Sequence, residues 1–218
     1  MTEVALPPGS VRPGGRTARV RAAVLRAAGD LLAEHGFARL DPSEVAALAG
    51  VGKTTVYRRW RGPAGLIADL LVDMAEQSLP RADTGSLLGD LTANAQLVGK
   101  TLTDPRQSRL FRAVVAAATT DESAAAALHH FYDTRLNEWA PCVEAAIARG
   151  EVPAGTDPRA VISAVSAPLY YRLLASGDPI DDTAVHAAAR AAAHAAAVGV
   201  FATRPGPELT PPRKDLDR

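Results

Sequence analysis

The stretch LDPSEVAALAGVGKTTVYRRW, residues 40–60, decides the fold of the N-terminal part of this chain. It opens with helix-start signals, because Asp41 is a favourable N-cap, Pro42 suits the first helical position and Glu44 completes an Asp-x-x-Glu capping box. The apolar face of this first helix consists of Val45, Ala46, Leu48 and Ala49. Gly50 is free to adopt the left-handed conformation that ends helices. The first half of the stretch therefore predicts a short helix that stops at a tight glycine turn.

The second half of the stretch predicts another short helix, which begins at Lys53 and reaches Trp60. Only Val56 and Trp60, four residues apart and so on one face, have the character of core positions. The cationic and hydroxyl side chains then project outward, as in a helix-turn-helix whose second helix lies in a major groove. An arginine there can pair bidentately with guanine, a contact worth about 1–3 kcal/mol of base discrimination. The side chains that we assign to DNA contact from this pattern are Ser43, Lys53, Thr54, Thr55, Arg58 and Arg59.

The same residues resemble the TetR family of transcriptional regulators. The family signature has three parts, and the chain carries each of them in order: Gly36-Phe37, Ala49-Gly50-Val51 and Tyr57-Arg58-Arg59-Trp60. The resemblance extends to about residue 71. It implies that Tyr57 contacts a backbone phosphate, that the protein is a homodimer that binds a palindromic double-stranded operator, and that a small-molecule effector, whose identity is unknown, controls repression.

Two departures from the family pattern bear on DNA binding. Asp41 stands where the family often has threonine, so a carboxylate replaces a hydroxyl contact to phosphate. Arg61-Gly62-Pro63 replaces the usual Pro-Ser-Lys, so a phosphate-anchoring lysine is missing, and we assign Arg61 to compensate for it. These departures leave an alternative open, namely a helical protein-interaction module or a ligand-independent regulator with a weakened DNA-binding head.

The charge distribution agrees with DNA binding at one end of the chain. The 218 residues have a net charge of zero, but residues 1–62 carry ten Arg or Lys against five Asp or Glu, and the remainder carries 14 against 19. A basic head on an acidic body directs attraction for DNA to the head. Six of the basic residues fall on the first helix or the recognition helix: Arg19, Arg21, Arg26, Lys53, Arg58 and Arg59.

The sequence predicts an all-α chain of about nine helices, in which a three-helix head is followed by a larger helical body. Residues 1–15 are rich in Pro and Gly and are expected to form a disordered basic arm, and residues 204–218 a disordered tail. Residues 16–62 are assigned to the helix-turn-helix domain, and residues 63–203 to a ligand-binding and dimerisation domain. No alternating β pattern of useful length occurs between these ends.

The expected helices are marked by their start and stop signals. The first covers residues 17–35 and ends at Gly36, and Pro63 opens the fourth, which links head and body. Further N-cap signals are Asp104-Pro105, Asp121-Glu122, Asp157-Pro158 and Asp181-Asp182. The helix that begins after Asp121 is long and is predicted to end at Gly150.

The body is similar to a C-terminal domain of actinobacterial TetR-like regulators in the segment SAPLYYRLLASGDPI, residues 166–180. This resemblance implies a four-helix bundle between the last two long helices and their two-fold mates, and a ligand pocket between the fifth and eighth helices. Pro168 would kink its helix there. Aromatic content of 5% argues against a large planar drug-binding cage. The candidate pocket residues are Phe111, Val114, Phe131, Trp139, Val143 and Tyr170.

Other functional classes find little support in the sequence. No catalytic residues are assigned, because no nucleophile–base pair or paired carboxylates occur, and no cofactor is expected. Gly52-Lys53-Thr54 suggests a phosphate loop, but Ala47 stands where that motif requires glycine. Adjacent His129 and His130 diverge by about 100° on a helix and do not chelate together, so no metal is expected. A single cysteine and the lack of a long apolar run predict a cytoplasmic protein that does not bind membranes.

Overall fold

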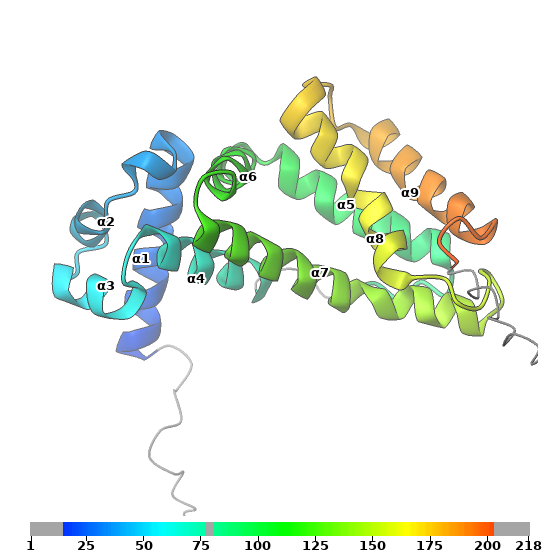
Figure 1. Ribbon diagram of the computed structural model, residues 1–218, viewed down its shortest axis with the longest axis horizontal. Coiled ribbons are helices and arrows are strands. Elements are labelled where there is room, and N and C mark those ends of the chain that lie inside the picture. The colour runs from blue at the N-terminus through cyan, green and yellow to red at the C-terminus, as the bar shows by residue number, and fades with distance from the viewer. Residues whose placement is uncertain (1–14, 77–80, 203–218) are drawn as a thin grey trace, which may run out of the picture.

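A computed structural model describes residues 15–76 and 81–202, and every regular element within these ranges is helical (Figure 1). The prediction of an all-α chain of about nine helices is confirmed, since these ranges contain α1 to α9, and their only β-type pairing is one isolated bridge between Thr156 and Ala202. No helix within the described ranges is both long and apolar enough to cross a bilayer. The predicted N-terminal arm, up to residue 14, and the C-terminal tail lie outside the described residues.

The head consists of four helices and one short 3-10 turn. Their bounds are α1 Arg16–His35, η1 Phe37–Arg39, α2 Pro42–Leu48, α3 Lys53–Trp60 and α4 Pro63–Glu76. Helix α1 ends where Gly36 adopts a φ of 75°, and α2 is followed by Gly50 with a φ of 65°. Gly50 therefore supplies the left-handed backbone that the sequence predicted, and α1 ends at Gly36 as predicted.

Helix α2 differs from the sequence prediction in two details. The Asp41 carboxylate accepts a hydrogen bond from the Ser43 amide at 2.8 Å, but the Asp41 amide donates to the Arg39 carbonyl. Glu44 therefore does not complete a capping box, because η1 already occupies the amide that it would bind. Leu48 was assigned to the apolar face and is 62% exposed. Helix α2 packs on α1 and α3 through a narrow stripe of Val45 and Ala46, and its last residue lies beyond that contact.

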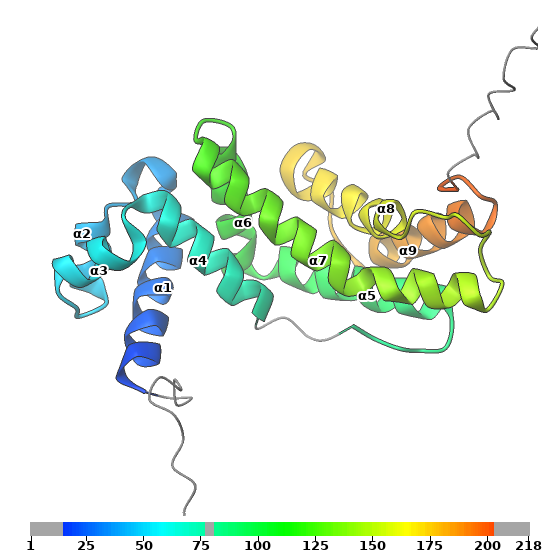
Figure 2. The ribbon, with the colours of Figure 1, turned by 60° about the horizontal axis from the view of Figure 1, so that its bottom comes forward.

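The body is built from five further helices. Their bounds are α5 Leu87–Thr103, α6 Pro105–Ala118, α7 Glu122–Ala148, α8 Pro158–Tyr171 and α9 Asp182–Ala197, with a π-helical turn η2, Arg172–Ser176, after α8. The predicted aspartate N-caps are all confirmed, since Asp104, Asp121, Asp157 and Asp181 each accept hydrogen bonds from first-turn amides. Helix α7 crosses the body and packs on α4, α6 and α8, whereas α9 packs on α5 and α8 (Figure 2).

The head and the body meet along two lines of contact. Helix α4 packs on α1 and α3 within the head and on α7 of the body, so it belongs to both parts. Helix α1 in turn packs against α6 (Figures 1 and 2). Leu66, Ile67, Leu70 and Leu71 of α4 are all buried. A displacement of α4 therefore disturbs packing on both sides of the joint.

Candidate nucleic-acid interface and ligand cavity

Helix α3 buries one side and exposes the other. Val56 is fully buried and Trp60 nearly so, as the sequence predicted, and both belong to the hydrophobic core. The predicted DNA-contact residues on this helix are exposed at Lys53, Thr54, Tyr57, Arg58 and Arg59, and Thr55 is half-buried. The N-cap, Gly52, has no side chain to bind the first-turn amides. Such amides are suited to binding an anion, because they carry partial positive charge.

The start of α2 lies beside the same surface. The hydroxyl oxygens of Ser43 and Tyr57 are 3.3 Å apart, so the structure brings these two predicted DNA-contact residues together. The Asp41 carboxylate, which caps α2 through the Ser43 amide, is exposed at the same helix end. Two hydroxyl groups and one carboxylate thus occupy this edge of the candidate interface.

Arg61 ends α3 in an unusual conformation. Its φ is 59°, and it is the one residue other than glycine with a positive φ among residues 15–76 and 81–202. Its amide donates to the Tyr57 carbonyl at 3.0 Å, and its side chain is exposed. A left-handed conformation costs an L-residue about 1–2 kcal/mol, and such strain gathers at functional sites. The exposed Arg61 side chain thus lies at the C-terminal end of α3, and its contact with DNA stays a prediction.

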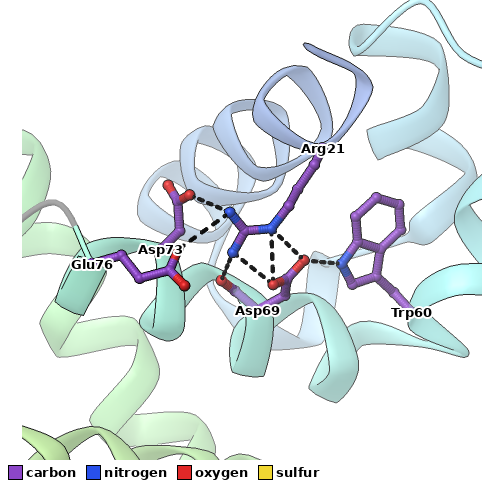
Figure 3. A network of polar contacts seen from close by, with 5 residues as sticks. All are labelled: Arg21, Trp60, Asp69, Asp73 and Glu76. Atoms are coloured by element: carbon purple, nitrogen blue, oxygen red, sulfur yellow. Dashed lines mark hydrogen bonds and ion pairs between the residues drawn. The ribbon is translucent and has the colours of Figure 1, made fainter. Parts of the chain in front are cut away.

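Arg21 of α1 is the centre of a polar network that joins three helices (Figure 3). Its guanidinium donates to the Asp69 carboxylate at 2.8 Å and to Asp73 at 2.7 Å, and lies 3.6 Å from Glu76. The indole N–H of Trp60 donates to the same Asp69 carboxylate at 2.8 Å. Counting Arg21 among the DNA-attracting cations was therefore wrong, because three carboxylates of α4 surround its charge.

The electrostatics of this network act mainly on Asp69. Partial burial works to raise the pKa of its carboxyl, but hydrogen bonds from Arg21 and Trp60, with the charges of Arg21 and Arg59, outweigh that effect and lower the pKa. The hydrogen bond to Asp69 raises the pKa of the Arg21 guanidinium in turn. Both groups stay charged near neutral pH. The network consequently fixes α3 and α1 on α4 through one carboxylate.

Two further arginine contacts shape the head. The Arg59 guanidinium lies 5.0 Å from the centre of the Trp60 ring, a cation–π distance. Arg106 of α6 donates to the Asp30 carboxylate of α1 at 2.7 Å, which ties the body to the head. Gly29 lets Arg106 lie across α1, because a Cβ at that position would approach the Arg106 Nη2 atom to 2.7 Å.

A cavity of about 100 Å³ lies among helices α5, α6, α7 and α8. Four of the predicted pocket residues line it: Phe111, Phe131, Trp139 and Tyr170. The assignment of Val114 and Val143 to the pocket was wrong, since both are fully buried in the packed core and do not border the cavity. Helical periodicity predicts which residues face the interior. It does not distinguish a residue that packs in the core from a residue that lines a cavity.

Aromatic rings gather at this cavity despite their low overall content. The chain has ten aromatic residues, and half of them line the cavity: Phe111, Phe131, Tyr132, Trp139 and Tyr170. Phe111 lies 5.8 Å from Phe131 and 5.9 Å from Tyr170, between ring centres, in tilted and edge-on orientations. The fold thus concentrates the few rings that the chain has around one small cavity.

The polar part of the cavity lining was not predicted from the sequence. These residues are Asn94, Thr101, Tyr132, Arg135 and Ser166, and Met74 of α4 also borders the cavity. Asn94 carried the one available signal, since it is a polar residue with apolar neighbours at helical spacing in α5, and such a position is buried. Arg135 gave no such signal, because it is followed three residues later by Glu138. In sequence, this spacing is the same as that of an ion pair on an exposed helix face.

Two tyrosine side chains pack against each other at the cavity. The centres of the two rings lie 5.6 Å apart in an edge-on orientation. Burial raises the pKa of Tyr132, and it raises the pKa of Tyr170 well above its usual value, with the Tyr132 hydroxyl adding to the effect. Both hydroxyls therefore stay protonated near neutral pH.

The remaining ionisable candidates do not form a site. His129 and His130 are exposed, and within the part of the chain that the structure describes no group of three His, Cys, Asp or Glu side chains is placed to hold a metal. His186 is exposed, and its Nδ1 atom contacts the Asp182 carbonyl of its own helix. Burial raises the pKa of the Cys142 thiol to about 11, which makes it a poor nucleophile.

Both parts of the chain match known protein families. Residues 24–70 match a family described as bacterial regulatory proteins of the tetR family, and residues 81–192 match the tetracyclin repressor-like C-terminal domain. The regulator YdeS of Bacillus subtilis (strain 168) is 32% identical over 163 residues, which cover 75% of this chain and 82% of the relative. The DNA-binding transcriptional repressor TetR of Mycobacteroides abscessus is 32% identical, with 74% and 85% covered.

A solved structure agrees with these matches. The TetR family transcription regulator SCO0332 has 30% sequence identity and a TM-score of 0.65, over 81% of this chain and 97% of that chain. The exposed cationic side of α3, the helix-turn-helix geometry around it and the two family matches lead to one conclusion. The chain belongs to the TetR family of helix-turn-helix transcriptional regulators.

Proposed function

We propose that this protein is a homodimeric repressor that inserts α3 into the major groove of a palindromic operator and is released by a small molecule bound in the body cavity. The observation that carries the DNA-binding part is that the cations of α3, Lys53, Arg58 and Arg59, are all exposed, whereas Val56 and Trp60 are buried. Arg58 and Arg59 read base edges, while Lys53, Tyr57 and Ser43 hold phosphates. Because its partner is chromosomal DNA, the protein acts in the cytoplasm.

The dimer is proposed to form through α8 and α9. Large apolar side chains are exposed at the ends of these helices, at Tyr171, Leu174, Val198 and Val200. Alanines on the exposed side of α9 allow the close approach of a second helix pair. A two-fold dimer presents two copies of α3, which suits half-sites about 34–36 Å apart on one face of the duplex.

Helix α4 is the proposed link between ligand and DNA. Met74 borders the cavity, and on the same helix Asp69 accepts the hydrogen bond from Trp60 of α3. A ligand that favours a shifted α4 also favours shifted recognition helices. By linkage, a coupling of about 1–3 kcal/mol weakens operator binding about 5- to 150-fold.

Selection of binding sites from random duplex DNA by the full-length protein tests the proposal. We expect an enriched palindrome with half-sites one helical turn apart. Arg58→Ala and Arg59→Ala should each lower affinity for that site about 5-fold or more, whereas Arg112→Ala, an exposed arginine of α6, should not. Lack of enrichment at low salt, or unchanged affinity for both α3 variants, would contradict the proposed interface.

A further inference from the structure

The cavity of the body holds two buried polar atoms that lack a hydrogen-bond partner. Asn94 is 4% exposed and Trp139 is 2% exposed, and both line the cavity. Among residues 15–76 and 81–202, neither the Oδ1 atom of Asn94 nor the indole N–H of Trp139 has a hydrogen-bond partner. Buried polar groups in native proteins are nearly always paired, so each unpaired atom calls for an explanation. Asn94 Oδ1 is a hydrogen-bond acceptor and the Trp139 N–H is a donor. A ligand group that both donates and accepts a hydrogen bond would satisfy the two atoms together.

The charge of the cavity is balanced before any ligand enters. Arg135 borders the cavity and forms an ion pair with Glu138 one turn away. The hydroxyls of Tyr132 and Tyr170 keep their protons, because burial raises the pKa of both groups. A charged ligand would therefore lose its hydration without gaining a free counter-charge. This environment favours a neutral compound.

The size and walls of the cavity favour a single ring. Its volume is about 100 Å³, and a cavity of about 150 Å³ in another protein is known to hold benzene. Phe111, Phe131 and Tyr170 surround it with rings whose mutual orientations are tilted or edge-on. A further aromatic ring can continue this edge-to-face packing, which is favourable because of the quadrupoles of the rings.

We infer that the cavity binds a neutral, single-ring aromatic compound with a hydroxyl or carboxamide group, whose oxygen accepts the Trp139 N–H and whose hydrogen is donated to Asn94 Oδ1. The inference rests on the proposed function, in which this cavity is the effector site. It adds the chemical class of the effector. It also assigns Trp139 and Asn94 as the residues that select that class.

Calorimetric titration of the full-length protein with four probes tests the class of ligand. Phenol and benzamide carry the required group, toluene has the ring without it, and benzoate adds a charge. We expect phenol and benzamide to bind about 5- to 10-fold tighter than toluene, which corresponds to one neutral hydrogen bond or slightly more, and benzoate to bind more weakly than benzamide. Equal affinities for phenol and toluene, or a preference for benzoate, would overturn the inference.

Two variants test the assigned residues. Trp139→Phe removes the N–H and Asn94→Leu removes the acceptor, and each should bring the phenol-to-toluene affinity ratio close to 1. The ratio is the useful quantity, because a change in cavity volume affects both probes alike. Asn137→Leu, at an exposed asparagine of the same helix as Trp139, is the matched control and should leave the ratio unchanged. A ratio that survives both cavity variants would remove the assignment.

Operator binding in the presence of phenol separates this inference from the proposed function. Val98 lines the cavity, and the larger side chain of Val98→Phe would occupy its space. This variant should abolish phenol binding while operator binding persists. An operator complex together with a phenol-to-toluene ratio of 1 overturns the inference and leaves the repressor intact. Selective phenol binding that does not change operator affinity supports the cavity chemistry and overturns its role in release.

Discussion

The two tryptophans of this chain occupy opposite polar environments. Trp60, in the head, is 5% exposed, and its indole N–H donates to Asp69 at 2.8 Å. Trp139, in the body, is 2% exposed, and its indole N–H has no partner in the part of the chain that the structure describes. Both rings belong to the hydrophobic core. The difference between them lies in whether the fold supplies an acceptor for the one polar atom of the side chain.

This difference corresponds to a difference in what each region must do. A DNA-reading helix needs a fixed orientation, and a charged acceptor held by Arg21 provides it by a hydrogen bond that is stronger than a neutral one. A ligand cavity needs unsatisfied groups, because a polar atom that is already paired cannot select a ligand. The head therefore uses the buried N–H of Trp60 to hold α3. In the part of the body that the structure describes, three buried side-chain atoms have no partner, those of Asn94, Gln107 and Trp139, and on the inference above the two that line the cavity, Asn94 and Trp139, serve recognition.

Removing the acceptor of Trp60 should have the largest effect on stability. Asp69→Ala removes the acceptor of the Trp60 indole N–H, which would then resemble the unpaired N–H of Trp139. It also removes one of the carboxylates that bind the Arg21 guanidinium. We expect a loss of about 2–3 kcal/mol in the free energy of unfolding, below the range for fully buried pairs, because the Arg21 and Asp69 side chains are 21% and 24% exposed. Chemical denaturation measures this loss, and Asp69→Asn, which keeps an acceptor, should lose less. A change under about 0.5 kcal/mol, ordinary for surface positions, would contradict it.

The stabilising effect of Asp69 should also depend on pH. Its carboxyl pKa is lowered in the folded state, so its contribution is complete above the unfolded value of about 4 and disappears as the pH falls through the lower folded value. The stability difference between wild type and Asp69→Ala should thus be constant between about pH 5 and 7 and shrink below about pH 4. A difference that grows on acidification would contradict the lowered pKa.

Matched substitutions of the two tryptophans sharpen the comparison itself. Trp60→Phe loses a hydrogen bond to a charged acceptor, whereas Trp139→Phe loses an N–H that had no partner. The loss of ring volume is the same in both variants. We therefore expect Trp60→Phe to be less stable than Trp139→Phe by about 1–2 kcal/mol. Thermal and chemical unfolding of both variants give this difference, and equal stabilities would show that the two indoles are equivalent.

Substitution of Arg61 should have a smaller effect, which raises stability but weakens operator binding. Arg61→Gly relieves the left-handed conformation at φ 59° but makes the unfolded chain more flexible, so the net gain should be about 0.5 kcal/mol. If Arg61 contacts DNA, the same variant weakens operator binding. Unfolding and operator titrations on one sample measure both. A variant that is less stable than wild type would contradict the strain.

The smallest expected effect concerns Asp41, the departure that left a weakened head open as an alternative. Asp41→Asn keeps an acceptor for the Ser43 amide, so stability should change by less than about 0.5 kcal/mol. Removal of the negative charge should tighten DNA binding a few-fold at low salt, and the gain should fade as salt rises. Glu44→Gln, at an exposed acid of the same helix, is the control. Equal gains in both variants would assign the effect to net charge.

Local features of the sequence predicted the structure correctly wherever a short-range rule applied. Gly50 adopts the predicted left-handed conformation, and α1 ends at Gly36 as predicted. Val56 and Trp60 face the core, and the predicted helices are capped by Asp104, Asp121, Asp157 and Asp181. Each of these outcomes depends on residues within about four positions of one another. Exposed cations on α3 follow from the same short-range periodicity, although their contact with DNA stays a prediction.

Errors arose where the outcome depends on partners far along the chain. Arg21 has the sequence signature of a DNA-facing cation, but the carboxylates that surround it lie 48 or more residues away on α4. Leu48 fits the apolar periodicity of α2, but it is the last residue of this short helix and no neighbouring helix among the described residues buries it. Val114 and Val143 face inward as predicted, yet they pack in the core and do not border the cavity.

The sequence by itself determined the helices, their ends and the exposed face of α3, because hydrogen-bonding rules and periodicity act over a few residues. Only the tertiary structure decided which buried polar atoms have partners, since a partner for Trp60 or its absence at Trp139 depends on how distant helices meet. The same packing gathered half of the aromatic rings at one cavity. The helix-turn-helix motif of the family can therefore be recognised from short segments of the sequence. The set of polar and aromatic groups that lines the cavity is formed only when the helices pack.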